Sequence, residues 1–265
     1  SGIRRGTITH RNELIETLEM AMSEAETMAN IKITKAILSI TGDHIRCLNT
    51  QAAIALNRAS GGPGGITERA IQDEDIYQVL DLAQAVSLPV DRDILHTLPQ
   101  EYLVDTLEEI KNPIGMTGRR LEGRVHLVTA ATTAMNNLVS CVEELGITVD
   151  GLVFQPLASA LATLHEDEME LGVTLVEIGS STTNIAVYHG SAIRHSAIIP
   201  IGASSITHDI AVMLQISIED AENIKIKYAS ARASLSSPKL EIEIPSQEGQ
   251  IERTIPEQEV SRYVE

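Results

Sequence analysis

Apolar residues recur along the chain in two patterns, one typical of helices and one typical of buried strands. Near the N-terminus, Leu14, Leu18, Ala21 and Ala25 stand three or four positions apart, which predicts an amphipathic helix. The apolar run 36–40 follows and predicts a short buried parallel strand. A helix that leads into such a strand indicates an α/β domain.

The segment from about 42 to 124 differs from this pattern. It contains a glycine-rich loop over 57–65 and a second amphipathic helix that ends before Pro89. Because no Lys-Ser or Lys-Thr pair follows its glycines, we interpret the loop as a surface loop rather than a phosphate loop. We expect the segment 42–124 to form a small α+β insertion.

Strand and helix signals then resume. They predict a strand at 125–129, a helix over 133–145, a strand at 151–154 and a helix over 158–164. The acidic run 166–170 is most simply a solvated linker.

The segment from 173 to 199 contains the residues that could bind a phosphate and a metal ion. Strand 173–178 ends on Glu177 and Ile178, and a turn rich in Gly, Ser and Thr (179–183) connects it to a returning strand. Small residues let backbone N–H groups converge on an anion, although such a turn is often only a turn. The carboxylate of Glu177 suits a magnesium ion held through water.

The residues after this turn predict further elements. The pair Gly190-Ser191 predicts a type II′ hairpin turn, because glycine holds its first central position. Ser204 or Ser205 is expected to cap one helix, and Ser217 opens the next. The run 240–245 predicts a strand followed by a polar loop, and the usual partners of this strand are expected to lie outside this sequence.

Composition limits the function. The 265 residues are 43% hydrophobic, 22% charged and 2% aromatic, with a net charge of −17. So acidic a chain is not expected to bind nucleic acid or to adhere unaided to anionic lipid. Cys47 and Cys141 match no metal or disulfide spacing, which favours reduced thiols in a cytosolic protein.

Several long strings carry a resemblance to a known family. They span 25–29, 39–45, 95–102, 110–118, 125–129, 192–200 and 221–228. With them the chain resembles the FtsA family of bacterial cell division proteins, members of the actin-like ATPase superfamily. The most specific strings, Leu95 to Tyr102 and Ile110 to Gly118, lie in the insertion that separates FtsA from its relatives.

The resemblance implies an α/β, actin-like (ribonuclease H-like) fold of two halves with an FtsA-specific α+β insertion subdomain. The expected parts are an incomplete first half (1–41 and 125–168), the insertion (42–124), the second half (169–216) and the start of a peripheral subdomain (217–265). The first phosphate loop and the C-terminal part of the family are expected to lie outside this sequence.

The resemblance also implies ATP and Mg²⁺ as cofactors. The residues expected at the nucleotide are Gly179, Ser180, Ser181, Thr182, Thr183 and Gly202 at the phosphates, Glu222 and Lys225 at the ribose and base, Glu177 at Mg²⁺ through water, and Gln155 at the attacking water. As an isolated pair, Glu222 and Lys225 would be an ordinary surface salt bridge.

FtsA proteins bind the C-terminal peptide of FtsZ, form filaments with themselves, and work with other division proteins. They are cytoplasmic and sit on the inner face of the inner membrane at the division site through a C-terminal amphipathic helix. The implied function is therefore a nucleotide-binding, filament-forming adaptor that links FtsZ to the membrane, and no nucleic acid is expected as a partner.

The phosphate turn departs from the family pattern, Asp-Ile-Gly-Gly-Gly-Thr-Thr-Asp. Here Glu177 and Asn184 replace the two aspartates, and Ser180 and Ser181 replace two glycines. A serine forced to a positive φ costs roughly 1 kcal/mol or more, so we expect weaker nucleotide binding. Hydrolysis is expected to be slow at most. The alternatives are an active actin-like ATPase that uses Glu177 and Gln155, and a pilus-assembly relative of the same superfamily.

Overall fold

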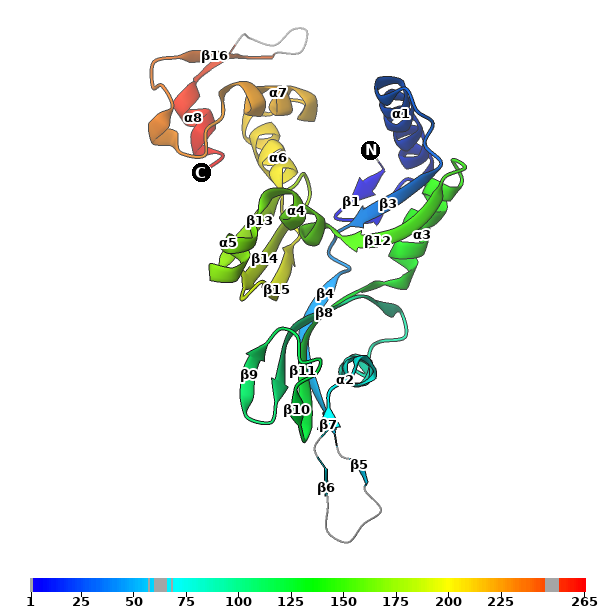
Figure 1. The fold of residues 1–265 in the computed structure, drawn as a ribbon. Helices are drawn as coiled ribbons and strands as arrows, with labels where there is room; N and C mark the ends of the chain where they lie inside the picture. Colours follow the sequence, from blue (N-terminus) through cyan, green and yellow to red (C-terminus); the bar gives the residue numbers. More distant parts are fainter. Residues whose placement is uncertain (1, 57, 60–65, 68, 246–252) are drawn as a thin grey trace. The chain divides into compact units, whose positions relative to one another are not determined.

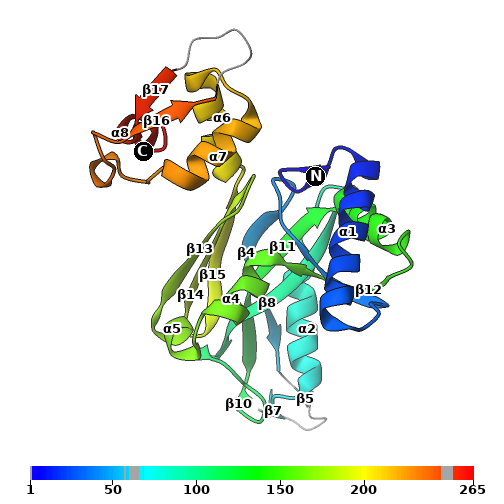
Figure 2. The same cartoon turned by 90° about the horizontal axis from the view of Figure 1, so that it is seen from above.

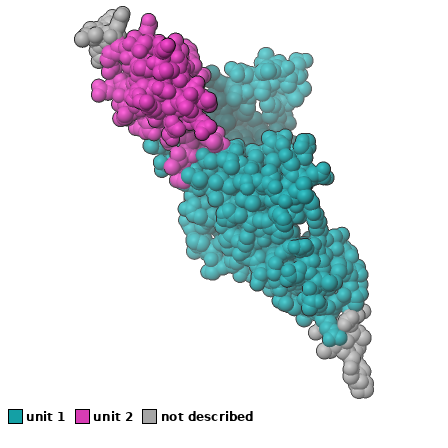
Figure 3. All heavy atoms as spheres, turned by 90° about the vertical axis from the view of Figure 1, so that its left-hand side faces the viewer, with its two compact units in different colours: residues 1–177, 183–199 teal, residues 178–182, 200–265 magenta. Residues whose placement is uncertain are grey.

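The computed structural model describes residues 2–56, 58–59, 66–67, 69–245 and 253–265 (Figure 1). The chain divides into two compact units, coloured separately in Figure 3. Unit 1 comprises residues 1–177 and 183–199, and unit 2 comprises residues 178–182 and 200–265. Each unit is described by itself. Most of the glycine-rich loop predicted over 57–65 lies outside the described residues.

An antiparallel sheet of four strands dominates one part of unit 1. Its order is β4 (Arg46–Ala55), β11 (Arg120–Ala131), β8 (Arg92–Val104) and β9 (Leu107–Ile110). Helix α2 (Asp73–Gln84) packs against β4 and β11 (Figure 1). Its Val79 and Ala83 are buried against the sheet, as the apolar spacing of this helix predicts.

A second part of unit 1 has α/β character. Strand β3 (Lys35–Ile40) pairs in parallel with β12 (Thr148–Phe154). The surrounding helices are α1 (Arg11–Ala29), α3 (Thr132–Glu143) and α4 (Gln155–Thr163). Helix α3 packs against β12, and α1 lies beside α3 (Figure 2). This confirms the predicted alternation of helices and strands.

Three further strands of unit 1 form a sheet in the order β13 (Val173–Ile178), β14 (Thr183–His189) and β15 (Ala192–Ile199). Strands β14 and β15 are antiparallel. The turn between them is not type II′, because Gly190 and Ser191 both take positive φ, 61° and 60°. Two positive φ values are typical of type I′, whose twist matches that of the strands.

The acidic run predicted as a linker is instead helix α5 (Glu166–Leu171). Its acidic residues lie in the first turn, where the helix dipole favours negative charge. The backbone N–H of His165 donates to the Glu168 carboxylate over 2.8 Å, which caps the start of the helix.

Unit 2 contains α6 (Ala203–Leu214), α7 (Ile218–Tyr228), the 3₁₀ turn η1 (Ala233–Leu235), β16 (Glu241–Ile244), β17 (Arg253–Pro256) and α8 (Glu257–Arg262). The hydroxyl of Ser217 accepts the Asp220 N–H over 3.0 Å and caps α7 as predicted. The strand predicted over 240–245 is β16, which pairs with β17 of this chain, and its Ile242 and Ile244 are buried in the core of this unit.

Short strand pairs complete the described chain: β1 (Ile3–Arg4) with β2 (Thr7–Ile8), β5 (Arg58–Ala59) with β6 (Ile66–Thr67), and β7 (Arg69–Ala70) with β10 (Thr117–Gly118). None of the helices in the described ranges combines the length and the apolar character that crossing a membrane requires.

Candidate functional site

The division into units falls within the phosphate motif, so its residues are taken one unit at a time. In unit 1, the structure brings together the two side chains predicted to be catalytic. Glu177 stands near the end of β13, and Gln155 begins α4. The Gln155 amide donates a hydrogen bond through Nε2 to Oε1 of Glu177. Both side chains are half-buried, so the pair is accessible to solvent.

Two further residues complete this group: Asn184, from the end of the phosphate motif, and Thr41, which the sequence did not indicate. Asn184 on β14 is 2% exposed, and its Nδ2 donates to Oε2 of Glu177 over 3.1 Å. The Thr41 hydroxyl in turn donates to Oδ1 of Asn184 over 2.6 Å. We call Thr41, Gln155, Glu177 and Asn184 the Glu177 cluster. Thr41 directly follows β3, a predicted parallel strand, and ligand sites commonly lie at the carboxyl ends of such strands.

The Glu177 cluster fits the cation expected from the family in one respect. A single half-exposed carboxylate suits Mg²⁺, which keeps most of its waters and takes few protein ligands. Within the described residues, no group of three or more His, Cys, Asp or Glu side chains gathers to hold a metal directly. A single carboxylate leaves most of the coordination positions of Mg²⁺ to water.

In unit 2, the turn that follows Ile178 is held by backbone hydrogen bonds. The Gly179 N–H donates to the Thr182 carbonyl over 2.9 Å and closes the turn. Thr182 is buried, whereas Ser180 is exposed. Neither Ser180 nor Ser181 takes a positive φ, so the backbone cost considered for these serines does not arise.

The turn packs directly on the start of α6. The N–H groups of Ala203 and Ser204 donate to the carbonyls of Gly179 and Ser180 over 2.9 and 2.8 Å. These carbonyls satisfy the free N–H groups of the helix start. The expected cap by Ser204 or Ser205 is therefore wrong.

The residue that precedes α6, Gly202, is its N-cap. A side-chain Cβ there would stand 2.5 Å from the Gly179 carbonyl oxygen and 2.6 Å from that of Ser180. Glycine is thus required at this position by close approach, although its φ of −152° is ordinary.

Glu222 and Lys225 lie together on α7 of the same unit. Lys225 Nζ donates to Glu222 Oε2 over 2.7 Å and to the buried Thr207 hydroxyl of α6 over 2.8 Å. It also reaches the Ala203 carbonyl at 3.3 Å. The Lys225 ammonium, and then the Thr207 hydroxyl, lower the pKa of Glu222. This pair is therefore tied to the first turn of α6, which an ordinary surface salt bridge would not be.

Another polar group of unit 1 has the appearance of a catalytic triad. His126 Nδ1 donates to Asn49 Oδ1 over 2.6 Å, and its Nε2 accepts from the Ser196 hydroxyl over 2.7 Å. We call these three residues the His126 cluster. Burial, and then the charge of His195, lower the pKa of His126 to about 4. Because His126 and Ser196 are 1% and 3% exposed, no substrate reaches them, and the cluster joins β11 to β15 structurally.

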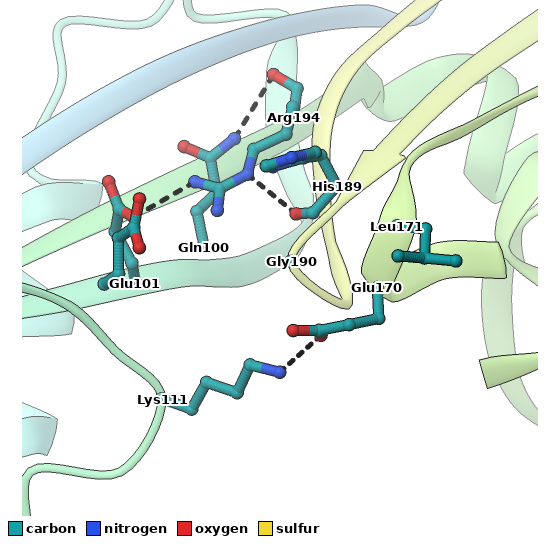
Figure 4. A pocket seen from close by; sticks show the side chains of 9 residues that line it. Gln100, Glu101, Lys111, Glu170, Leu171, His189, Gly190 and Arg194 are labelled. Carbon is teal, nitrogen blue, oxygen red and sulfur yellow. Dashed lines mark hydrogen bonds and ion pairs between the residues drawn. The ribbon is translucent and has the colours of Figure 1, made fainter. Parts of the chain in front are cut away.

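A cavity of about 320 Å³ lies in unit 1 where β8 and β9 approach α5 and the β14–β15 turn. Figure 4 shows its charged side chains paired with one another: Arg194 with Glu101, and Lys111 with Glu170. The Lys111 ammonium, and then the Ser191 hydroxyl, lower the pKa of Glu170. Since both basic side chains of the lining are already paired with carboxylates, we do not interpret the cavity as a ligand site.

Comparison with known families gives two matches. The model of the SHS2 domain inserted in FtsA matches residues 42–129, and the model of cell division protein FtsA matches residues 174–261. Cell division protein FtsA of Pseudomonas aeruginosa is 40% identical over 264 residues, which is 100% of this chain and 61% of that protein. Its counterpart in Escherichia coli is 35% identical over 264 residues, or 100% of this chain and 60% of that protein. The chain thus spans about three fifths of these relatives.

Among solved structures, a chain of the PilM–PilN type IV pilus biogenesis complex superposes with a TM-score of 0.61 at 12% identity. The match covers 86% of this chain and 60% of that chain. At this identity the likeness concerns the fold alone. Together with the inserted SHS2 domain, it confirms the predicted actin-like α/β fold with an α+β insertion.

Proposed function

Because the chain belongs to the FtsA family of cell division proteins, we propose that it is a nucleotide-binding, filament-forming adaptor that links FtsZ to the cytoplasmic membrane. The observation that carries this proposal is identity of 40% to an FtsA protein along the whole chain, insertion included. Identity is only 12% to the pilus-assembly structure, so the sequence match favours division over pilus assembly.

The proposed ligand is ATP with Mg²⁺. In unit 2, the small residues of the turn Gly179–Thr182 are proposed to meet the phosphates with backbone N–H groups and hydroxyls. Gly202 lets the start of α6 pack closely on this turn. In unit 1, Thr183 continues the turn, and Glu177 offers a carboxylate to the cation through water. When bound, the cation would neutralise phosphate charge.

Glu222 and Lys225 are proposed to face the ribose and base. Lys225 is 17% exposed and Glu222 is 43% exposed, so the carboxylate is the more accessible partner. With its charge neutralised by Lys225, Glu222 can accept ribose hydroxyl hydrogen bonds without strongly repelling phosphate.

We propose that hydrolysis is slow or absent. The Gln155 amide, which is expected to orient an attacking water, instead donates a hydrogen bond to the Glu177 carboxylate. The same contact supports the alternative, an active ATPase, because it already places Gln155 beside the carboxylate. Steady phosphate release that Glu177→Ala abolishes would favour that alternative.

Thermal unfolding of the full-length protein tests nucleotide binding. Millimolar Mg·ATP should raise Tm, because a ligand that binds only the folded state stabilises it. Gly202→Ala should remove most of this increase. Gly151→Ala is the matched control, since a Cβ at Gly151 meets no atom within 4 Å. Absence of any Tm increase in the unaltered protein would remove nucleotide from the proposal.

The adaptor role needs a separate experiment. The full-length protein should bind a peptide with the C-terminal sequence of FtsZ and should recruit that peptide to vesicles of bacterial phospholipid. Electron microscopy of the same vesicles should show filaments when ATP is present. If the protein does not bind the peptide, the adaptor proposal fails even if nucleotide binds.

A further inference from the structure

Asn184 holds the Glu177 carboxylate from a buried position. Its Nδ2 donates to Oε2 of Glu177 over 3.1 Å, and its Oδ1 accepts from the Thr41 hydroxyl over 2.6 Å. A carboxylate only accepts hydrogen bonds, so the amide must turn its NH₂ group toward Glu177. The hydroxyl of Thr41 then fixes the other end of the amide. The side chain therefore has one satisfied orientation.

The second oxygen of the carboxylate is held in the same way. Gln155 Nε2 donates to Oε1 of Glu177, so neutral amides hold both oxygens. In the described part of the chain, no Lys, Arg or His side chain forms an ion pair with Glu177. The carboxylate is thus fixed in place while its negative charge stays uncompensated. An aspartate at position 184 would place a second carboxylate 3.1 Å from the first.

We propose that Asn184 is a positioning residue that fixes Glu177 and keeps this place at a single negative charge. The inference rests on the proposed function, since it concerns the cation that accompanies the nucleotide. A site with one carboxylate repels the phosphates less than a site with two. The amide of Asn184 should therefore make ATP binding depend less on the divalent cation than a carboxylate at the same position would.

The pairing itself is tested without nucleotide. Asn184→Asp should lower Tm by roughly 4 °C or more at pH 7.5, because two like charges then face each other. The double variant Glu177→Gln with Asn184→Asp exchanges donor and acceptor and should recover at least half of that loss. Asn137→Asp, on an exposed position of α3, is the matched control and should change Tm little. Equal Tm values for the Asn184 and Asn137 variants would overturn the pairing.

The functional part is tested by ATP affinity in millimolar magnesium and in excess EDTA. The ratio of the Kd in EDTA to the Kd in magnesium should be the same, within about threefold, for the unaltered protein and for Asn137→Asp. For Asn184→Asp, the Kd in EDTA should rise at least tenfold, and magnesium should restore it, since the cation screens the added charge. A merely structural residue would change both Kd values together.

The outcomes separate this inference from the proposed function. If the unaltered protein binds ATP and Asn184→Asp shows the same magnesium dependence, the inference falls and the proposed function stands. If the unaltered protein binds no ATP in either buffer, both fall.

Discussion

Two polar clusters in unit 1 each join the β14–β15 hairpin to a strand far away in the sequence. The His126 cluster connects β15 to β11, and the Glu177 cluster connects β14 to the residue that follows β3. Both rely on neutral donors such as serine, threonine and asparagine. In the His126 cluster every nitrogen of the ring has a partner and the ring is sealed from water. In the Glu177 cluster the carboxylate is charged and half-exposed.

The difference separates a structural group from one built for a ligand. A buried polar group that is fully satisfied contributes specificity to the fold and has no capacity left for a ligand. The Glu177 carboxylate is held in place by neutral donors and is half-exposed, so it can still bind a cation. Triad-like geometry at His126 is therefore a weaker indication of function than the simpler arrangement at Glu177.

The largest expected effect is acid destabilisation through His126. Its pKa is about 4 when folded, below the ordinary 6.5, so protonation favours the unfolded chain. The contribution of neutral His126 to the free energy of unfolding is complete above pH 6.5. It is lost as the pH falls to about 4, which lowers that free energy by about 3 kcal/mol. Urea unfolding at pH 7.5 and 4.5 measures it. The variant His126→Gln does not titrate, so its stability should fall less over the same interval; an equal fall would assign the effect to other groups.

Ser196→Ala should cause the next largest loss of stability. It leaves Nε2 of His126 without its donor inside a sealed space, which costs about 2 kcal/mol. Chemical denaturation measures this cost, and Ser23→Ala on the exposed side of α1 is the matched control. A cost below about 0.5 kcal/mol would mean that water enters the His126 cluster, and the contrast between the clusters would disappear.

Glu177→Ala should cost less, about 1 kcal/mol. It removes the acceptor of Asn184, but the space it vacates adjoins solvent, so a water molecule can replace the carboxylate. The same denaturation experiment measures it. A loss of stability as large as that of Ser196→Ala would mean that the Glu177 cluster is structural, like the His126 cluster.

Lys225→Met should have the smallest effect on stability, under about 1 kcal/mol, because its partner Glu222 is 43% exposed and screened by water. The informative readout is the pKa of Glu222, which Lys225 lowers and which should rise in the variant. The pair contributes stability above the ordinary pKa of a glutamate and loses it as the pH falls through the lowered value. NMR titration of Glu222 measures this; an unchanged pKa would assign the lowering to Thr207.

The sequence by itself determined the family, the fold class and most helices and strands. Apolar periodicity is a local property, and the specific strings in the insertion need no knowledge of contacts. Rules based on nearby residues failed where residues distant in the sequence supply the hydrogen bonds. The first turn of α6 needs no serine cap because the carbonyls of Gly179 and Ser180 satisfy its N–H groups.

Only the tertiary structure decided which polar residues act together. Thr41 and Asn184 stand 143 positions apart, and His126 and Ser196 stand 70 apart. No spacing rule relates such residues, because strand pairing and sheet packing bring them together. The sequence placed Glu177 at the end of a strand. The packing of the strands around it determined that two neutral amides hold its carboxylate, since hydrogen-bond partners are set by distance in space.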